Sequence, residues 1–145
     1  MSHDRPILLL INDNANETEL ISEIFKNNYK HCVLYNIENI SSLDNFLLKS
    51  DDYNNVKTPE LIIYSTDSFK ENEYKIIGEI KNNSEFKFIP IVIFTKQESA
   101  DNINKYYNIY SNACIIKPDN NDEFNNLIVS IVNFWTDIVK LPIIQ

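Results

Sequence analysis

Polar side chains that could take part in chemistry follow short apolar runs at four places in the chain. Each run is rich in β-branched and other apolar residues, which is typical of a strand buried on both faces. In an open parallel sheet, functional groups lie where the carboxyl ends of the strands meet. A serine there can act as a nucleophile if a general base takes its proton, and a carboxylate can hold a cation. The candidate residues at these ends are Asn12 and Asp13, Ser65, Thr95, and Lys117.

The elements that must position these residues alternate along the chain. The strand-like runs are Ile7–Ile11, Cys32–Tyr35, Leu61–Ser65, Ile91–Thr95 and Ala113–Ile116. Helical spacing lies between and after them, over about 14–28, 41–50, 74–80, 98–108 and 121–140. The first of these helices begins with Asn14 and Glu17, which resembles a capping box. This alternation predicts an α/β fold, a doubly wound sandwich, in one domain over residues 1–145.

Composition excludes several functions. The net charge of −8 argues against a nucleic-acid partner, because phosphate contacts need clustered basic residues. No apolar run is long enough to cross a bilayer, so we expect a cytoplasmic protein without membrane contact. The chain has one glycine, Gly78, whereas phosphate-cradling loops need several, so P-loop and Rossmann nucleotide sites are excluded. Cys32 and Cys114 are expected on opposite edge strands, roughly 19 Å apart, which is too far for a disulfide.

Several segments resemble the anchor motifs of CheY-like response-regulator receiver domains. They are Ile11-Asn12-Asp13-Asn14, the run Ile91–Thr95, and Cys114-Ile115-Ile116-Lys117-Pro118. The stretch from Asn133 to Pro142 is similar to the end of stand-alone receivers related to the cyanobacterial phytochrome regulators. The resemblance covers nearly the whole chain. It implies a flavodoxin-like (βα)5 sandwich with a five-stranded parallel sheet in the order 2-1-3-4-5.

The resemblance also implies a phosphorylation pocket, and here the chain departs from it. In the family, an aspartate ends the central strand and accepts a phosphoryl group from a histidine kinase, and an acidic pair holds Mg²⁺. Thr95 and Lys117 match the pattern, and Asp13 matches the second acid of the pair. Asn12 replaces the first acid, and Ser65 replaces the acceptor. Cys114 stands at the switch position, where many relatives have Tyr or Phe. The degenerate pocket comprises Asn12, Asp13, Ser65, Asp67, Thr95 and Lys117.

Loss of these carboxylates weakens the expected metal site. Mg²⁺ prefers hard anionic oxygens and releases its waters reluctantly. Only Asp13 remains of the family's three converging carboxylates, so we expect weak or absent Mg²⁺ binding and no other cofactor. The interpretation we favour for Asp13 and Lys117 is an ion pair that closes the top of the sheet.

Two hypotheses of different classes follow, and we favour the first. The chain is a pseudo-receiver of two-component signalling, not an enzyme, and acts by binding a signalling protein such as a histidine kinase or another regulator. Alternatively, it is an active phosphorelay acceptor that uses Ser65, with Asp13 as general base, or uses Asp67 as a relocated acceptor. A more distant alternative is a small-molecule enzyme on the same fold.

The last helix offers an interaction surface. Its apolar residues span an arc of about 160°, whereas covering a sheet needs a stripe of a little over about 100°. We therefore expect a homodimer through this face, although packing by the chain's own ends is the competing explanation. The candidate interface residues are Tyr106, Tyr110, Leu127, Phe134, Trp135 and Ile138.

Overall fold

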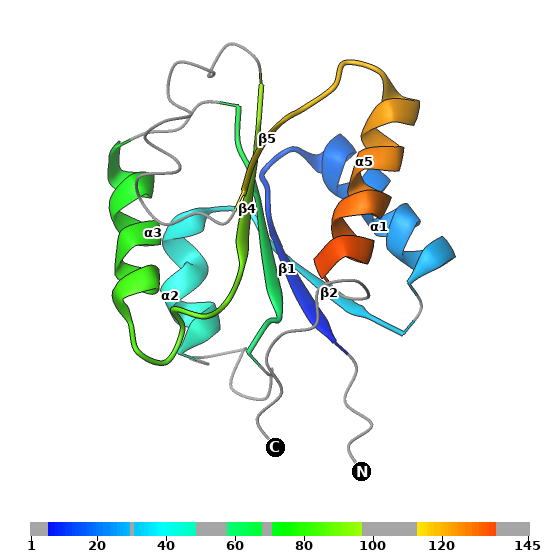
Figure 1. Ribbon diagram of the computed structural model, residues 1–145. Helices are drawn as coiled ribbons and strands as arrows, with labels where there is room; N and C mark the ends of the chain where they lie inside the picture. Colours follow the sequence, from blue (N-terminus) through cyan, green and yellow to red (C-terminus); the bar gives the residue numbers. More distant parts are fainter. Residues whose placement is uncertain (1–5, 30, 49–57, 68–70, 97–112, 136–145) are drawn as a thin grey trace.

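The computed structural model describes residues 6–29, 31–48, 58–67, 71–96 and 113–135. Within them, the chain forms a five-stranded parallel sheet in the order β2-β1-β3-β4-β5, as predicted (Figure 1). The strands are β1 (Ile7–Ile11), β2 (Val33–Ile37), β3 (Leu61–Ser65), β4 (Ile91–Thr95) and β5 (Ala113–Ile116).

The second strand lies one residue later at its start than expected, and two later at its end. The register explains this difference, because Ile7 pairs with Val33 and Ile11 with Ile37. A strand that borders β1 along its full length runs on until β1 ends. Hydrogen bonding confirms the alignment just beyond the strands, since the backbone N–H of Asn12 donates to the Ile37 carbonyl at 3.0 Å.

Helices cover both faces of the sheet (Figure 1). One face carries α1 (Ala15–Asn28) and α5 (Asn121–Asn133), and the other carries α2 (Leu43–Leu47) and α3 (Glu71–Asn82). A short 3₁₀ turn, η1 (Ile40–Ser42), leads into α2 and is capped by Asn39. The helix expected over 98–108 and the end of the last helix lie outside the described residues. None of the described helices is long and apolar enough to cross a membrane.

The core has two layers because successive strand residues point to opposite faces. Leu9, Ile62 and Ile93 pack in the layer under α2 and α3, whereas Leu8 and Ile63 pack in the layer under α1 and α5. All five residues of β3 are buried. The register places the ends of the strands at one edge of the sheet, so the residues that follow them gather there.

Tyr29 fastens the end of α1 to α5. Its hydroxyl lies 3.0 Å from the carbonyl oxygen of Val129 and 2.6 Å from Oδ1 of Asn133. Its ring is buried and contacts the ring of Phe25, with the centroids 5.4 Å apart. The two helices that cover this face are therefore joined by a polar contact as well as by apolar packing.

We predict that Tyr29→Phe lowers the free energy of unfolding by about 1 to 2 kcal/mol. The substitution keeps the ring but leaves the partly buried acceptors on α5 without this donor. Urea denaturation followed by circular dichroism measures the change. Tyr35→Phe is the control, because the ring of Tyr35 meets the ring of Phe46 edge-on and is kept in this variant. This substitution should change the free energy of unfolding by less than about 0.5 kcal/mol. Equal losses in both variants would contradict the assigned role of the Tyr29 hydroxyl.

Candidate functional site

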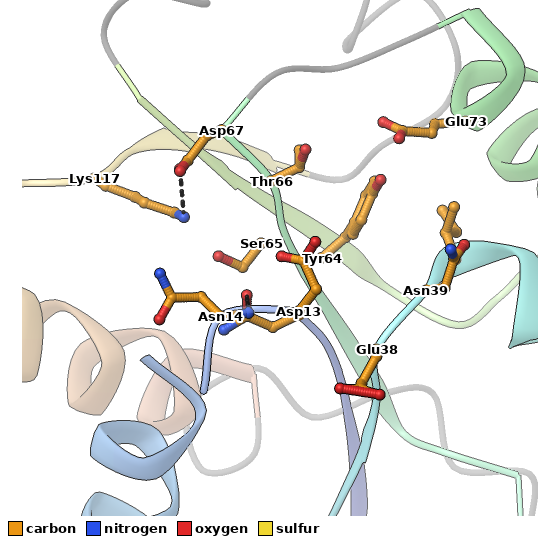
Figure 2. Close-up of a pocket in the computed structure, with 12 residues that line it drawn as sticks. Asp13, Asn14, Glu38, Asn39, Tyr64, Ser65, Thr66, Asp67, Glu73 and Lys117 are labelled. Atoms are coloured by element: carbon orange, nitrogen blue, oxygen red, sulfur yellow. Dashed lines mark hydrogen bonds and ion pairs between the residues drawn. The ribbon is translucent and has the colours of Figure 1, made fainter. Parts of the chain in front are cut away.

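The carboxyl edge of the sheet contains a polar pocket of about 290 Å³. Figure 2 shows its walls, which come from the loops after β1, β2 and β3 and from α3 and Lys117. The pocket brings together most of the residues that sequence analysis singled out: Asn12, Asp13, Ser65, Asp67 and Lys117. Thr95 is not among the lining residues and is fully buried at the end of β4.

Lys117 lies at the centre of an ion-pair network. Its Nζ atom is 3.0 Å from Oδ1 of Asp67 and 3.2 Å from Oε2 of Glu17, and its side chain is only 9% exposed. Figure 2 shows Asp67 and Lys117 pointing toward each other. Lys96 adds a second cation to Asp67 at 3.4 Å.

The expected ion pair between Asp13 and Lys117 is wrong. Asp13 is exposed, and Lys117 pairs with Glu17 and Asp67 instead. The physical reason lies in the direction of each side chain. Asp13 lines the pocket together with Glu38 (Figure 2), whereas Glu17, in the first turn of α1, is the carboxylate that reaches Lys117.

Glu17 is the functional residue that sequence analysis missed. Its Oε1 atom accepts hydrogen bonds from Oγ of Ser65 and from Nδ2 of Asn12, the latter at 3.2 Å. Its Oε2 atom accepts from Lys117. We call these four residues, Glu17, Ser65, Asn12 and Lys117, the Glu17 cluster. One carboxylate thereby joins groups from the ends of β1, β3 and β5.

The way α1 is capped leaves the side chain of Glu17 available for these contacts. Asn14 caps α1 as expected, because its Oδ1 atom accepts from the backbone N–H of Glu17 at 3.0 Å. In a full capping box, the Glu17 side chain would accept from the backbone N–H of Asn14. That N–H donates instead to Oδ1 of Asn12 at 3.1 Å. The signal that could have identified Glu17 was a glutamate in the first helical turn after a strand, together with Asn12. The side-chain amide of Asn12 can accept the Asn14 N–H in place of Glu17.

The cluster also revises the chemistry suggested for Ser65. The hydroxyl is buried and donates to Glu17, so Asp13 is not the base that contacts it. Among the described residues, no group of three or more His, Cys, Asp or Glu side chains could hold a metal ion. The Oγ1 atom of Thr95 is buried and has no hydrogen-bond partner among the residues that the structure describes.

Local charge and burial set the protonation of the surrounding groups. Partial burial opposes ionisation of Asp67, but the hydrogen bonds and charges of Lys117 and Lys96 hold the pKa of its carboxyl below the usual value. Burial, and then the charge and hydrogen bond of Glu73, raise the pKa of the Tyr64 phenol. Burial raises the pKa of the Cys114 thiol to about 11, so this thiol stays protonated at neutral pH.

The switch position and the candidate interface lie away from the pocket. Cys114 is half-buried in β5 and packs against the core layer under α2 and α3. Leu127 and Trp135 pack against the other layer, while the side chain of Phe134 is 46% exposed and meets the Trp135 ring edge-on. Tyr106, Tyr110 and Ile138 lie outside the described residues.

Comparisons with known proteins identify relatives over nearly the whole chain. Response regulator Rcp1 of Synechocystis sp. is 26% identical over 142 residues, which cover 97% of this chain and 96% of Rcp1. The probable methanogenesis regulatory protein FilR2 of Methanothrix harundinacea is 22% identical over 142 residues, covering 97% of this chain and 90% of FilR2. No protein-family model matches the chain.

Solved structures agree with these relatives. The phosphorylated cyanobacterial phytochrome response regulator RcpA superimposes with a TM-score of 0.85 at 24% identity, covering 97% of this chain and 100% of RcpA. The Mn²⁺-bound form of Rcp1 gives a TM-score of 0.82 at 25% identity, covering 95% of this chain and 99% of Rcp1. The sheet order and these similarities lead to one conclusion: the chain has the fold of CheY-like response-regulator receiver domains and is similar over nearly its whole length to the stand-alone cyanobacterial phytochrome regulators.

Proposed function

We propose that this receiver domain is a pseudo-receiver of two-component signalling, which acts in the cytoplasm by binding another signalling protein rather than by accepting a phosphoryl group. The observation that carries the proposal is Ser65, which ends β3 where the resemblance implies an acceptor aspartate. A carboxylate attacks phosphorus without losing a proton, whereas an alcohol needs a base. The base that the described hydrogen bonds place next to Ser65 is the Glu17 carboxylate, and two further donors, Asn12 and Lys117, also engage this carboxylate.

The charges around Lys117 support the same proposal. Two carboxylates, those of Glu17 and Asp67, already lie within ion-pair distance of this lysine. Their like charge opposes the approach of a third anion. Lys117 is therefore already paired with carboxylates of its own chain. The proposed binding partner accordingly recognises a conformation that does not depend on phosphate.

An active phosphorelay acceptor is the second candidate function, and Asp67 is the observation that favours it. Its side chain is 50% exposed, lines the pocket and is held in the ionised state by two lysines. RcpA, a structural relative, exists in a phosphorylated form. The two candidates differ in whether this chain gains a phosphoryl group.

We predict that the protein gains no phosphoryl mass when it is incubated with acetyl phosphate and Mg²⁺. Intact-mass spectrometry detects the added group, and RcpA in the same mixture serves as the positive control. A labelled protein would overturn the pseudo-receiver proposal. In that case, variants Ser65→Ala and Asp67→Asn identify the acceptor by loss of the label.

We predict that Mg²⁺ binds with a dissociation constant in the millimolar range or weaker. Asn12 supplies an amide where a second carboxylate is needed, so Asn12→Asp should tighten binding by about tenfold or more, since one added charge near the ion contributes more than about 1 kcal/mol. Isothermal titration calorimetry measures both affinities. Asn126→Asp on the exposed side of α5 adds the same charge far from the pocket and should leave the affinity unchanged. Sub-millimolar affinity in the unaltered protein would contradict the prediction.

We also propose that the protein forms a homodimer through the α5 face, and predict that Phe134→Glu shifts it toward the monomer. The exposed ring of Phe134 lies at the edge of the apolar arc, and a charge there resists burial. Light scattering over a concentration series measures the mass. Phe88→Glu is the matched control, because Phe88 is exposed in the loop before β4. A strict monomer at high concentration removes the proposal.

A further inference from the structure

We propose that Glu17 is a built-in carboxylate plug: it occupies the cluster of Ser65, Asn12 and Lys117 from within the chain and keeps small oxyanions such as inorganic phosphate out. The inference rests on the proposed pseudo-receiver function and names the residue that keeps phosphate away from the donors of the Glu17 cluster. It follows from three features of the cluster, namely its donors, its burial and the match between neighbouring residues.

The donors form a set suited to an oxyanion. An ammonium, a hydroxyl and an amide N–H converge on the two oxygens of one carboxylate. Charge-assisted hydrogen bonds of this kind are shorter and stronger than neutral ones. A phosphate oxygen and a carboxylate oxygen compete for the same donors, so the two anions exclude each other.

Partial burial strengthens the ion pair between Glu17 and Lys117. The side chain of Glu17 is 18% exposed and that of Lys117 is 9% exposed. A charge pair shielded from water interacts more strongly than one on the open surface. The anchor on the helix side is also fixed, because the backbone N–H of Glu17 is bonded to the Asn14 cap.

The two departures from the family pattern fit Glu17. Asn12 donates to Glu17 through Nδ2 and accepts from the backbone of Asn14 through Oδ1, and an aspartate at this position has no N–H to donate. Ser65 also donates to Glu17, whereas an aspartate there would bring two carboxylates into contact. Asn12, Ser65 and Glu17 therefore form a mutually consistent set of donors and acceptor.

Removing the charge of Glu17 should open the cluster to inorganic phosphate. In Glu17→Gln, phosphate should raise the melting temperature progressively with concentration, because a ligand that binds the folded state stabilises it. The unaltered protein and Glu19→Gln should show no such rise at the same ionic strength. Glu19 is an exposed residue of the same helix turn, so this control removes the same charge without touching the cluster. Adding Lys117→Met to Glu17→Gln should abolish the response.

A second measurement does not depend on phosphate. Ser65→Asp should lower the melting temperature more in the unaltered background than in the Glu17→Gln background, because only the former contains the opposing carboxylate. Glu17→Ala provides the same comparison if Glu17→Gln fails to fold.

The inference is overturned if phosphate stabilises the unaltered protein as much as Glu17→Gln, if Glu17→Gln shows no phosphate response, or if Ser65→Asp has the same effect in both backgrounds. Each of these failures leaves the pseudo-receiver proposal intact, because that proposal is tested separately by the mass of the unaltered protein after exposure to acetyl phosphate.

Discussion

The rest of the site depends on compensation of the charge on Lys117. This ammonium is largely shielded from water, and a shielded charge without a partner is strongly destabilising. Asp67 cannot meet the need alone, since it is half-exposed and shares its carboxylate with Lys96. Glu17 supplies the second and more buried anion. The carboxylate that a strand-end aspartate would bring from the sheet comes here from a helix.

This relocation changes how the missing acceptor is understood. Under the proposed pseudo-receiver function, Ser65 and Asn12 taken singly are losses from a phosphorylation pocket. Taken with Glu17, they are the donors that a differently placed carboxylate requires. The receiver fold is retained because its core is formed by the apolar strands and helices, which do not depend on which element carries the charge. Fold and chemistry are thus separable in this domain.

The fold was predictable because its signals are local. Buried strands of four or five residues between helical repeats leave few topologies, and the resemblance selected the order that the structure has. Most of the pocket was predictable for the same reason, because parallel strands end together. Glu17 was missed because the capping box already accounted for it. The Glu17 side chain can turn toward the strand ends because Asn12, and not Glu17, accepts the hydrogen bond from the Asn14 N–H. The spacing of residues along the chain does not reveal which of the two accepts it. Asp13 was misjudged because its position at the edge does not determine which way its side chain points.

Helix α1 is held at both ends, by Glu17 near its start and by Tyr29 at its cap. A helix fixed in this way presents its surface already in the shape that a partner meets, so little ordering entropy is lost on docking. Association with the proposed partner would then proceed in one step, at a rate set by diffusion and by the net charge of −8 on this chain. Under the proposed pseudo-receiver function, discrimination between partners would come from the residues displayed on that surface. The time spent bound, rather than a chemical on-state, would then determine how long the signal lasts.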